Sequence, residues 1–199
     1  MKNLQIEHYD ALLFDLDGTL ADTMPLHNQA WISALKDLGY PMTPEILFEY
    51  AGVSTFKTAE IFNERFGWEL NPQSFASEKD NRFLQNIHLV RPIEGVLKIA
   101  KQNFQRKPMA IVSGGSRLMI ESILNTLQIG DLFPIRICAE DTLHGKPHPE
   151  PFLSAARLLK VKPEKCLVFE DGEPGIQGAK LSAMGVVKVG LNHELLFLG

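Results

Sequence analysis

The sequence predicts an α/β fold in which helices cover both faces of an open parallel sheet, with a helical insertion after the first strand. Short apolar runs typical of strands buried on both faces occur at residues 11–14, 109–112, 167–169 and 186–189, with a weaker one at 135–138. Helical patterns separate the later runs. Strands that alternate with helices favour βαβ units and therefore a parallel sheet.

The helices expected between these strands follow from apolar residues that recur on one face. They span Leu118–Leu127, Phe152–Leu159 and Ile176–Met184, and Gly185 is expected to end the last of them. Right-handed crossovers place the loops that follow parallel strands at one edge of the sheet. Ligands bind at that edge in such sheets, so the residues just after each strand are the candidates for function.

The segment from about Thr23 to Ile87 differs in character because all its patterns are helical. Two stripes of apolar residues recur at helical spacing, one from Ala30 to Leu38 and one from Phe56 to Phe66, and a last helix is expected from Phe75 to Ile87 with Lys79 in its stripe. Thr43 and Pro44 resemble a helix cap followed by proline at the first helical position. We therefore expect a core formed by residues 1–22 and 89–199 and a helical cap domain formed by residues 23–88, with the aromatic stripes as the core of the cap.

Composition narrows the function classes. The 199 residues carry a net charge of −4, and the longest basic stretch is Arg106-Lys107, so nucleic acid is not an expected partner. No apolar stretch is long enough to span a membrane and the N-terminus does not resemble a signal peptide, so a cytoplasmic protein with no membrane partner is expected. Cys138 and Cys166 lie in apolar runs without metal-like spacing and are expected to be buried thiols. We expect a monomer, with a homodimer as the alternative.

The first candidate motif, Asp15-Leu16-Asp17-Gly18-Thr19, directly follows the first apolar run. Two carboxylates that emerge from a buried strand are costly unless a cation or a reaction uses them. A carboxylate can attack phosphorus to form an acyl phosphate, and a second acid can protonate the leaving group and later activate water. The pattern therefore favours Asp15 as nucleophile and Asp17 as general acid and base, with Thr19 contributing its hydroxyl and N–H group. A strand ended by a simple Asx turn is the alternative.

Three further motifs follow the later strands. Ser113 and Gly114 precede an expected helix, where a hydroxyl and free N–H groups suit phosphate, while Ser116 can cap that helix. Lys146 precedes Pro147 and Pro149, which stiffen its loop, and it could neutralise charge beside a carboxylate nucleophile. Glu170 and Asp171 end a strand and offer the paired oxygen ligands that suit Mg²⁺.

Together the four motifs resemble those of the haloacid dehalogenase-like superfamily, in the same order and at compatible spacing over essentially the whole chain. The resemblance implies a Rossmann-like core with an inserted cap, Asp15 as nucleophile and Asp17 as general acid and base. It also implies that Ser113 and Lys146 bind phosphate and that Mg²⁺ is the cofactor. The metal would be held by Asp15 and Asp171, with the backbone carbonyl of Asp17 as a further ligand and Glu170 supporting the acidic pair. The dehalogenase branch is disfavoured because it has no use for the metal acids.

Within the superfamily the chain is most similar to the β-phosphoglucomutase-like branch and its sugar-phosphate phosphatases. His27 and Trp31 resemble residues of the first cap helix there, and Gly52 begins a loop that resembles the one that meets substrate. A β-phosphoglucomutase carries a lysine and an arginine where this chain has Ala51 and Thr55, and it needs them to hold a second phosphate. Lys57 is a possible substitute for those charges.

Three functions therefore compete. The first is a Mg²⁺-dependent phosphatase that hydrolyses a small-molecule phosphomonoester, a sugar phosphate, through an aspartyl-phosphate. The second is a phosphosugar mutase that uses the same core. The third is a phospholigand sensor without catalysis, which is disfavoured because no catalytic position is lost.

Overall fold

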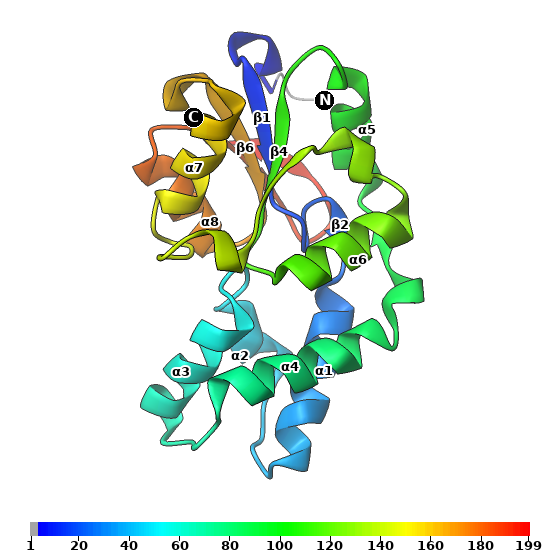
Figure 1. The fold of residues 1–199 in the computed structure, drawn as a ribbon, viewed down its shortest axis with the longest axis vertical. Coiled ribbons are helices and arrows are strands. Elements are labelled where there is room, and N and C mark those ends of the chain that lie inside the picture. The colour runs from blue at the N-terminus through cyan, green and yellow to red at the C-terminus, as the bar shows by residue number, and fades with distance from the viewer. Residues whose placement is uncertain (1–3) are drawn as a thin grey trace.

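A computed structural model describes residues 4–199 and contains a six-stranded sheet flanked by helices, with a separate group of helices at one end (Figure 1). The strand order is β5-β4-β1-β6-β7-β8, and every neighbouring pair except β7 with β8 is parallel. The strands are β1 (Ala11–Phe14), β4 (Met109–Val112), β5 (Ile135–Ile137), β6 (Cys166–Glu170), β7 (Gly185–Val189) and β8 (Leu195–Phe197). The predicted α/β class and its parallel sheet are confirmed.

The central strand β1 is wholly apolar because both of its faces are covered. Leu12 and Phe14 pack into the core on one face of the sheet, whereas Ala11 and Leu13 pack into the core on the other. Successive side chains of a strand point to opposite faces, so a strand covered on both sides needs apolar residues at every position. On the first face Phe14 stacks on Phe169 of β6 with the ring centroids 4.8 Å apart.

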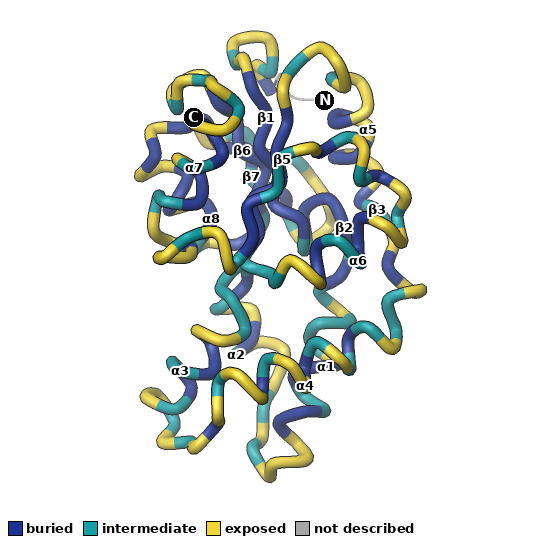
Figure 2. The backbone as a smooth tube through the Cα atoms, viewed as in Figure 1, coloured by how far each residue is buried: buried dark blue, intermediate teal, exposed yellow. Residues whose placement is uncertain are grey.

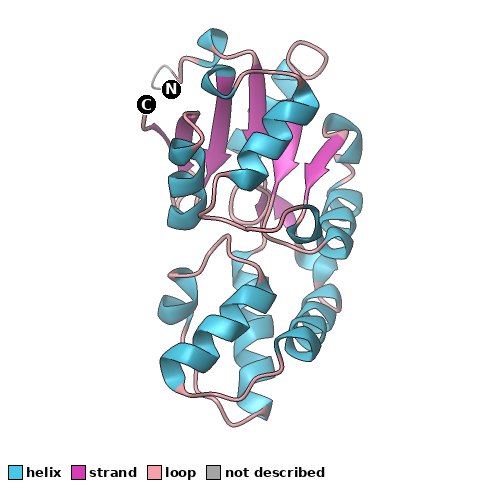
Figure 3. Cartoon of the chain, turned by 60° about the vertical axis from the view of Figure 1, so that its left-hand side comes forward, coloured by secondary structure: helices cyan, strands magenta, loops and turns pink. Residues whose placement is uncertain are grey.

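Helices cover both faces of the sheet (Figure 3). Buried residues of α5 (Glu94–Asn103) and α6 (Arg117–Leu127) belong to the same cluster as Leu12 and Phe14. Buried residues of α7 (Glu150–Leu159) and α8 (Glu173–Leu181) belong to the cluster on the opposite face. The sheet is therefore the middle of three layers, and its carboxyl-terminal edge stays free for a site.

Three features of this core differ from the sequence prediction. The edge strand β8 was not predicted and is antiparallel to β7. The α5 helix, amphipathic but short, was also missed. The helix expected at Ile176–Met184 instead spans Glu173–Leu181, because Ala183 takes a left-handed conformation with φ of 57° that ends it before Gly185, the first residue of β7.

The second body of the molecule, here called the helical lobe, consists of four helices below the sheet edge (Figure 1). Their bounds are α1 (Met24–Asp37), α2 (Pro44–Phe48), α3 (Thr55–Phe66) and α4 (Pro72–Leu84). They enclose a hydrophobic cluster of their own, in which Trp31 packs against Phe62 and Phe75. Figure 2 shows buried positions among exposed ones along these helices. Thr43 precedes α2 as expected, although its side chain accepts no capping hydrogen bond. The domain boundaries at residues 22/23 and 88/89 stay predictions.

A short antiparallel pair joins the lobe to the core. Strand β2 (Ala21–Asp22) pairs with β3 (Arg91–Pro92), so the chain enters and leaves the lobe through adjacent strands. Both cysteines are buried and unpaired, as expected. No helix within residues 4–199 combines the length and the apolar character needed to cross a membrane.

Candidate active site

The residues singled out after four apolar runs converge at one edge of the sheet. Asp15 directly follows β1, Ser113 follows β4, and Glu170 and Asp171 lie at the end of β6. Because β1 pairs with both β4 and β6 in parallel, the carboxyl ends of all three strands meet. Lys146 reaches the same edge from the loop that precedes α7.

The strongest feature of this edge is a cluster of three acids. Asp15, Glu170 and Asp171 each offer a carboxylate oxygen, and these oxygens all lie within 4.8 Å of one another. Asp15 is 2 % exposed and Glu170 is fully buried. Burial of the charged form is costly, so the pKa of Asp15 is raised to about 6 and that of Asp171 to about 7, with the charge of neighbouring acids adding to the rise.

Lys146 is the cation of this cluster. Its buried ammonium Nζ lies 2.6 Å from Asp15 Oδ1 and 2.6 Å from Glu170 Oε2. Burial alone would lower the pKa of Lys146, but the charges of Asp15 and Glu170 raise it well above its usual value. The lysine therefore stays cationic and holds the two carboxylates in place.

The donor set fits a divalent cation. Three carboxylates share one ammonium, and such an excess of buried negative charge is stable only with a further positive charge or with bound protons. Both oxygens of Glu170 are engaged, one by Lys146 and the other by the N–H group of Gly172. The side-chain hydrogen bonds of Asp15 and Asp171 engage only Oδ1 of each, which leaves the Oδ2 atoms for a metal. Hard oxygen ligands of this kind suit Mg²⁺.

The turn after β1 depends on glycine and threonine at fixed positions. Gly18 has a φ of 78°, and a Cβ atom there would lie 2.3 Å from Asp171 Oδ2. Only glycine allows the turn to pass so close to the acid. Thr19, fully buried, donates its hydroxyl to Asp171 Oδ1 at 3.1 Å, so it positions this acid.

The loop after β4 faces the helical lobe. Ser113 Oγ accepts a hydrogen bond from the N–H group of Gly115 at 3.0 Å, and Ser116 caps α6, as the sequence predicted. A Cβ atom at Gly114 would lie 2.4 Å from the carbonyl oxygen of Gly52, in the lobe loop between α2 and α3. The absence of a side chain at position 114 therefore lets the lobe loop lie directly against the sheet edge.

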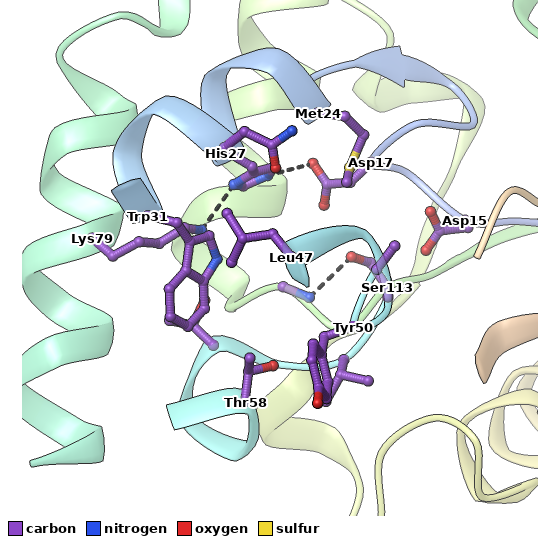
Figure 4. A pocket seen from close by; sticks show the side chains of 17 residues that line it. Asp15, Asp17, Met24, His27, Trp31, Leu47, Tyr50, Thr58, Lys79 and Ser113 are labelled. Atoms are coloured by element: carbon purple, nitrogen blue, oxygen red, sulfur yellow. Dashed lines mark hydrogen bonds and ion pairs between the residues drawn. The ribbon is translucent and has the colours of Figure 1, made fainter. Parts of the chain in front are cut away.

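Asp17 points away from the acid cluster and toward the helical lobe (Figure 4). Its Oδ1 accepts the hydroxyl of Thr23 at 2.6 Å and lies 2.9 Å from Nε2 of His27. The other ring nitrogen of His27, Nδ1, lies 2.8 Å from Nζ of Lys79 in α4. Since an ammonium group can only donate, Nδ1 accepts and Nε2 carries the proton that it donates to Asp17.

This chain of contacts sets the charge of Asp17. Burial alone would raise its pKa, but His27, the hydroxyl of Thr23 and the charge of Lys79 together lower it to about 2. Burial and the nearby Lys79 charge lower the pKa of His27, which keeps the imidazole neutral. The sequence analysis placed Lys79 in a helical stripe and gave it no role. A lysine among the apolar residues of a stripe is a signal of a buried polar partner, and the 3 % exposure of Lys79 in the structure agrees with that signal.

A cavity of about 80 Å³ separates these groups from the lobe (Figure 4). The sheet edge contributes Asp15, Asp17 and Ser113 to its wall, and the lobe contributes residues of α1, α2, α3 and the loop at Gly52. The cavity shares several lining residues with a wider groove between the lobe and the loop that contains Lys146. His144 and His148 lie exposed in that loop, as expected.

The fold and this edge site define a Rossmann-like α/β hydrolase. The chain belongs to the family described as haloacid dehalogenase-like hydrolase, whose model matches residues 12–189. The family resemblance predicted from the motifs is thereby confirmed.

The relatives of this chain include a sugar-phosphate phosphatase and a β-phosphoglucomutase. The chain is 32% identical over 186 residues to the fructose-1-phosphate phosphatase YqaB of Escherichia coli, a match that covers 93% of this chain and 98% of that protein. A crystal structure of β-phosphoglucomutase from Clostridium difficile is 30% identical with a TM-score of 0.78, covering 92% of this chain and 85% of that one. CbbY from Rhodobacter sphaeroides shares the fold, with a TM-score of 0.82 at 22% identity over 96% and 91% of the two chains. The chain is an enzyme, a phosphoric monoester hydrolase of this family.

Proposed function

We propose that this enzyme is a Mg²⁺-dependent phosphatase that hydrolyses a small sugar phosphate through an aspartyl-phosphate on Asp15. One observation carries the proposal. Asp15 lies in a buried cluster with Lys146 and two acids, while Asp17, two residues further on, is turned to a different set of partners. Two neighbouring carboxyl groups with such different surroundings suit the separate roles of nucleophile and general acid and base.

In the first step an oxygen of Asp15 attacks phosphorus, and the bond between phosphorus and the substrate oxygen breaks. The leaving oxygen takes a proton from Asp17. In the second step Asp17 accepts a proton from water, the resulting hydroxide attacks phosphorus, and the bond to Asp15 breaks to release phosphate. Asp17 thus returns to its starting protonation state at the end of each turnover.

Asp17 must be protonated for the first step, although its contacts lower its pKa to about 2 in the ligand-free arrangement. A phosphate group that binds beside Asp17 brings negative charge, which raises the pKa of that carboxyl. His27 and Thr23 favour the ionised form that the second step requires. Substrate charge and protein contacts therefore favour the two protonation states in turn.

The remaining polar groups of the edge bind and orient the phosphoryl group. Lys146 neutralises its charge next to Asp15, and Ser113 and the N–H group of Gly114 bind its oxygens. A bound Mg²⁺, held by Asp15 and Asp171 with the carbonyl of Asp17, would act as a Lewis acid on the phosphoryl oxygens. Thr19 and Glu170 position these ligands.

The helical lobe acts as a cap that excludes water from the reaction. Its loop at Gly52 lies against the sheet edge at Gly114, α1 supplies His27 as a partner of Asp17, and α4 supplies Lys79, which contacts His27. Opening would separate His27 and Lys79 from Asp17, so we expect substrate entry and product release to require lobe movement about the β2–β3 pair.

The charges of the lobe support a phosphatase rather than a mutase. Ala51 and Thr55 are neutral where a β-phosphoglucomutase carries cations. Lys57, the possible substitute, has a side chain that is 59% exposed and is paired with Glu60. A mutase must hold a second phosphate in the cap, whereas the two lysines of the lobe that line the groove, Lys57 and Lys79, are each paired with an acid. A sugar phosphate as substrate is supported by the named activity of the relative YqaB on fructose 1-phosphate.

The test is hydrolysis of p-nitrophenyl phosphate and of a panel of sugar monophosphates by the purified chain. We expect activity that requires Mg²⁺ and that falls by at least about 10⁴-fold in Asp15→Asn, because an amide is a poor nucleophile. Asp10→Asn, which changes an exposed aspartate near the N-terminus, serves as the matched control. Activity retained in Asp15→Asn, or unaffected by a chelator, would contradict the proposal.

A further inference from the structure

Two histidine side chains face each other on the loop that carries Lys146, and the proposed reaction uses neither of them. The ring centroids of His144 and His148 lie 4.7 Å apart, with the ring planes tilted by 47°. Both residues are exposed, and both line the groove between this loop and the helical lobe. Imidazole nitrogens are the commonest protein ligands of transition metals, so an accessible pair of neighbouring imidazoles is a candidate metal site.

Glu150 ties the two ends of this loop together. Its carboxylate accepts the N–H groups of Leu143 and His144, each at 3.0 Å, and its own N–H group donates to Nδ1 of His148 at 3.2 Å. The backbone N–H group of His148 donates to the carbonyl oxygen of Gly145 at 2.9 Å. The two rings are therefore held close together before any metal binds, which lowers the entropy cost of binding one.

The nitrogen of His148 that can bind a metal is Nε2, because Nδ1 accepts the N–H group of Glu150. When Nε2 binds a cation, the proton of the neutral ring moves to Nδ1, and Oε2 of Glu150, now 3.9 Å away, can accept it after a small rotation. The exposed N–H group of Glu150 then bonds to water. A carboxylate behind a metal-binding imidazole is the usual arrangement in metal sites, where it fixes the tautomer of the ring.

The pair supplies two ligands of a site and not a complete set. Zn–N bonds of about 2.0–2.1 Å in a tetrahedral site place two nitrogens about 3.3 Å apart, a separation that the two rings can reach by side-chain rotation. Within residues 4–199 the acid cluster is the one group of three ligands that already lie within 4.8 Å of one another. Water or a phosphate oxygen would therefore complete the coordination of a cation held by His144 and His148.

Ligand chemistry separates this pair from the acid cluster. Imidazole nitrogens favour Zn²⁺, Ni²⁺ and Cu²⁺, whereas Mg²⁺ prefers carboxylate oxygens such as those of Asp15 and Asp171. In a solution that contains both kinds of cation, an excess of Mg²⁺ fills the acid cluster and leaves the histidine pair to the transition metal. The two sites can therefore be occupied by different ions at the same time.

We infer that His144 and His148 form an inhibitory site for a divalent transition metal, with Zn²⁺ as the expected ion. The groove that the pair lines also contains Ser113 and Lys146. A cation with open coordination positions in this groove holds a phosphate oxygen of the substrate there, in competition with the site at Asp15. The metal site goes beyond the proposed phosphatase function, whereas its inhibitory effect rests on that function.

The first test measures metal binding without catalysis. Zn²⁺ is titrated calorimetrically into the chain without a histidine tag, in excess Mg²⁺ that fills the acid cluster. We expect one saturable site, and His144→Gln and His148→Gln should each weaken its affinity by at least about 10-fold, because the second ligand of a linked pair binds at a high effective concentration. His193→Gln, which changes an exposed histidine between β7 and β8, is the matched control and should bind Zn²⁺ like the wild type. No saturable binding, or equal affinity in the wild type and both pair variants, would overturn the site.

The second test measures inhibition. Hydrolysis of p-nitrophenyl phosphate in excess Mg²⁺ should fall as Zn²⁺ is added, and half-inhibition of His148→Gln should need at least about 10-fold more Zn²⁺ than half-inhibition of the wild type. Without Zn²⁺ the two chains should have the same kcat/KM, because His148 takes no part in the reaction. His193→Gln should be inhibited like the wild type. Equal inhibition of the wild type and His148→Gln would place the effect at the acid cluster and overturn the inhibitory role.

The two proposals fail in different ways. If the wild-type chain hydrolyses no phosphate ester, the phosphatase function and the inhibitory role fail together, while the Zn²⁺ titration still decides the metal site. If hydrolysis depends on Asp15 and Mg²⁺ but Zn²⁺ binds equally to the wild type and the pair variants, only the metal site fails. Thermal unfolding of the three histidine variants checks that each of them is folded.

Discussion

The surroundings of Asp15 and Asp17 differ although the two residues leave the same strand. Asp15 is held by the core, through Lys146 and next to Glu170 and Asp171, and its pKa is raised to about 6. Asp17 is held by the hinge and the helical lobe, through Thr23 and His27, and its pKa is lowered to about 2. The core therefore surrounds one carboxyl with other acids, and the lobe surrounds the second with donors.

The difference matters because only the partners of Asp17 can change when the lobe moves. The partners of Asp15 come from β6 and from the loop before α7, both parts of the rigid core. Those of Asp17 include His27 on α1 and, behind it, Lys79 on α4. A movable lobe can therefore control the general acid and base while the nucleophile stays fixed.

Asp17→Asn should cause the largest loss of activity after Asp15→Asn, because it removes the general acid and base and leaves the nucleophile in place. Asp17→Asn is expected to lower kcat for a sugar phosphate by about 10²–10⁴-fold, the usual contribution of general acid and base catalysis. Binding of inorganic phosphate should persist, because Lys146 and Ser113 are intact. Steady-state kinetics together with phosphate titration measures both, and full activity would refute the assigned role.

Breaking the lobe contact should have a smaller effect. Lys79→Met removes the charge behind His27 and is expected to lower kcat by about 3- to 10-fold, because the second step needs Asp17 in its ionised form and the positive charge of Lys79 lowers the pKa of Asp17. Loss of that charge should raise this pKa and move the acidic limb of the pH profile of kcat to higher pH. Lys101→Met, an exposed lysine of α5, is the matched control and should leave the profile in place. A Lys79→Met profile with an unmoved acidic limb would show that the contact does not act on Asp17.

The acid cluster of the core should respond to pH through its metal. Asp15 and Asp171 have pKa values raised to about 6 and about 7 in the metal-free protein, so protons compete with Mg²⁺ below that range. We expect Mg²⁺ to raise the melting temperature by several degrees at about pH 8 and by much less at about pH 5. Thermal unfolding with and without Mg²⁺ at the two pH values measures this. An equal shift at both, or a shift retained in Asp171→Asn, would argue against this metal site.

Much of the core could be predicted because its signals are local. The run at 11–14 is wholly apolar because both faces of β1 are covered, and the polar residues that follow it mark the sheet edge. The strand β8 was missed because it is short and lies at the sheet edge, where its residues are only partly covered. An edge strand of this kind carries no continuous apolar run.

The contacts of the lobe could not be predicted in the same way. His27 and Lys79 are 52 positions apart and meet only because α1 packs against α4. Nothing in the local pattern shows which polar residue of a helix faces a distant carboxylate. Burial and hydrogen bonding in three dimensions supply that information.

The most direct test of the central claim is a search for the phosphoryl group on Asp15. In Asp17→Asn the first step with p-nitrophenyl phosphate should proceed, because p-nitrophenolate leaves without a proton, whereas the second step lacks its base. Rapid mixing followed by an acid quench and peptide mass spectrometry should then show a p-nitrophenolate burst stoichiometric with enzyme and a phosphorylated peptide that contains Asp15. A burst that is absent, or phosphate found on any other residue, would contradict the account.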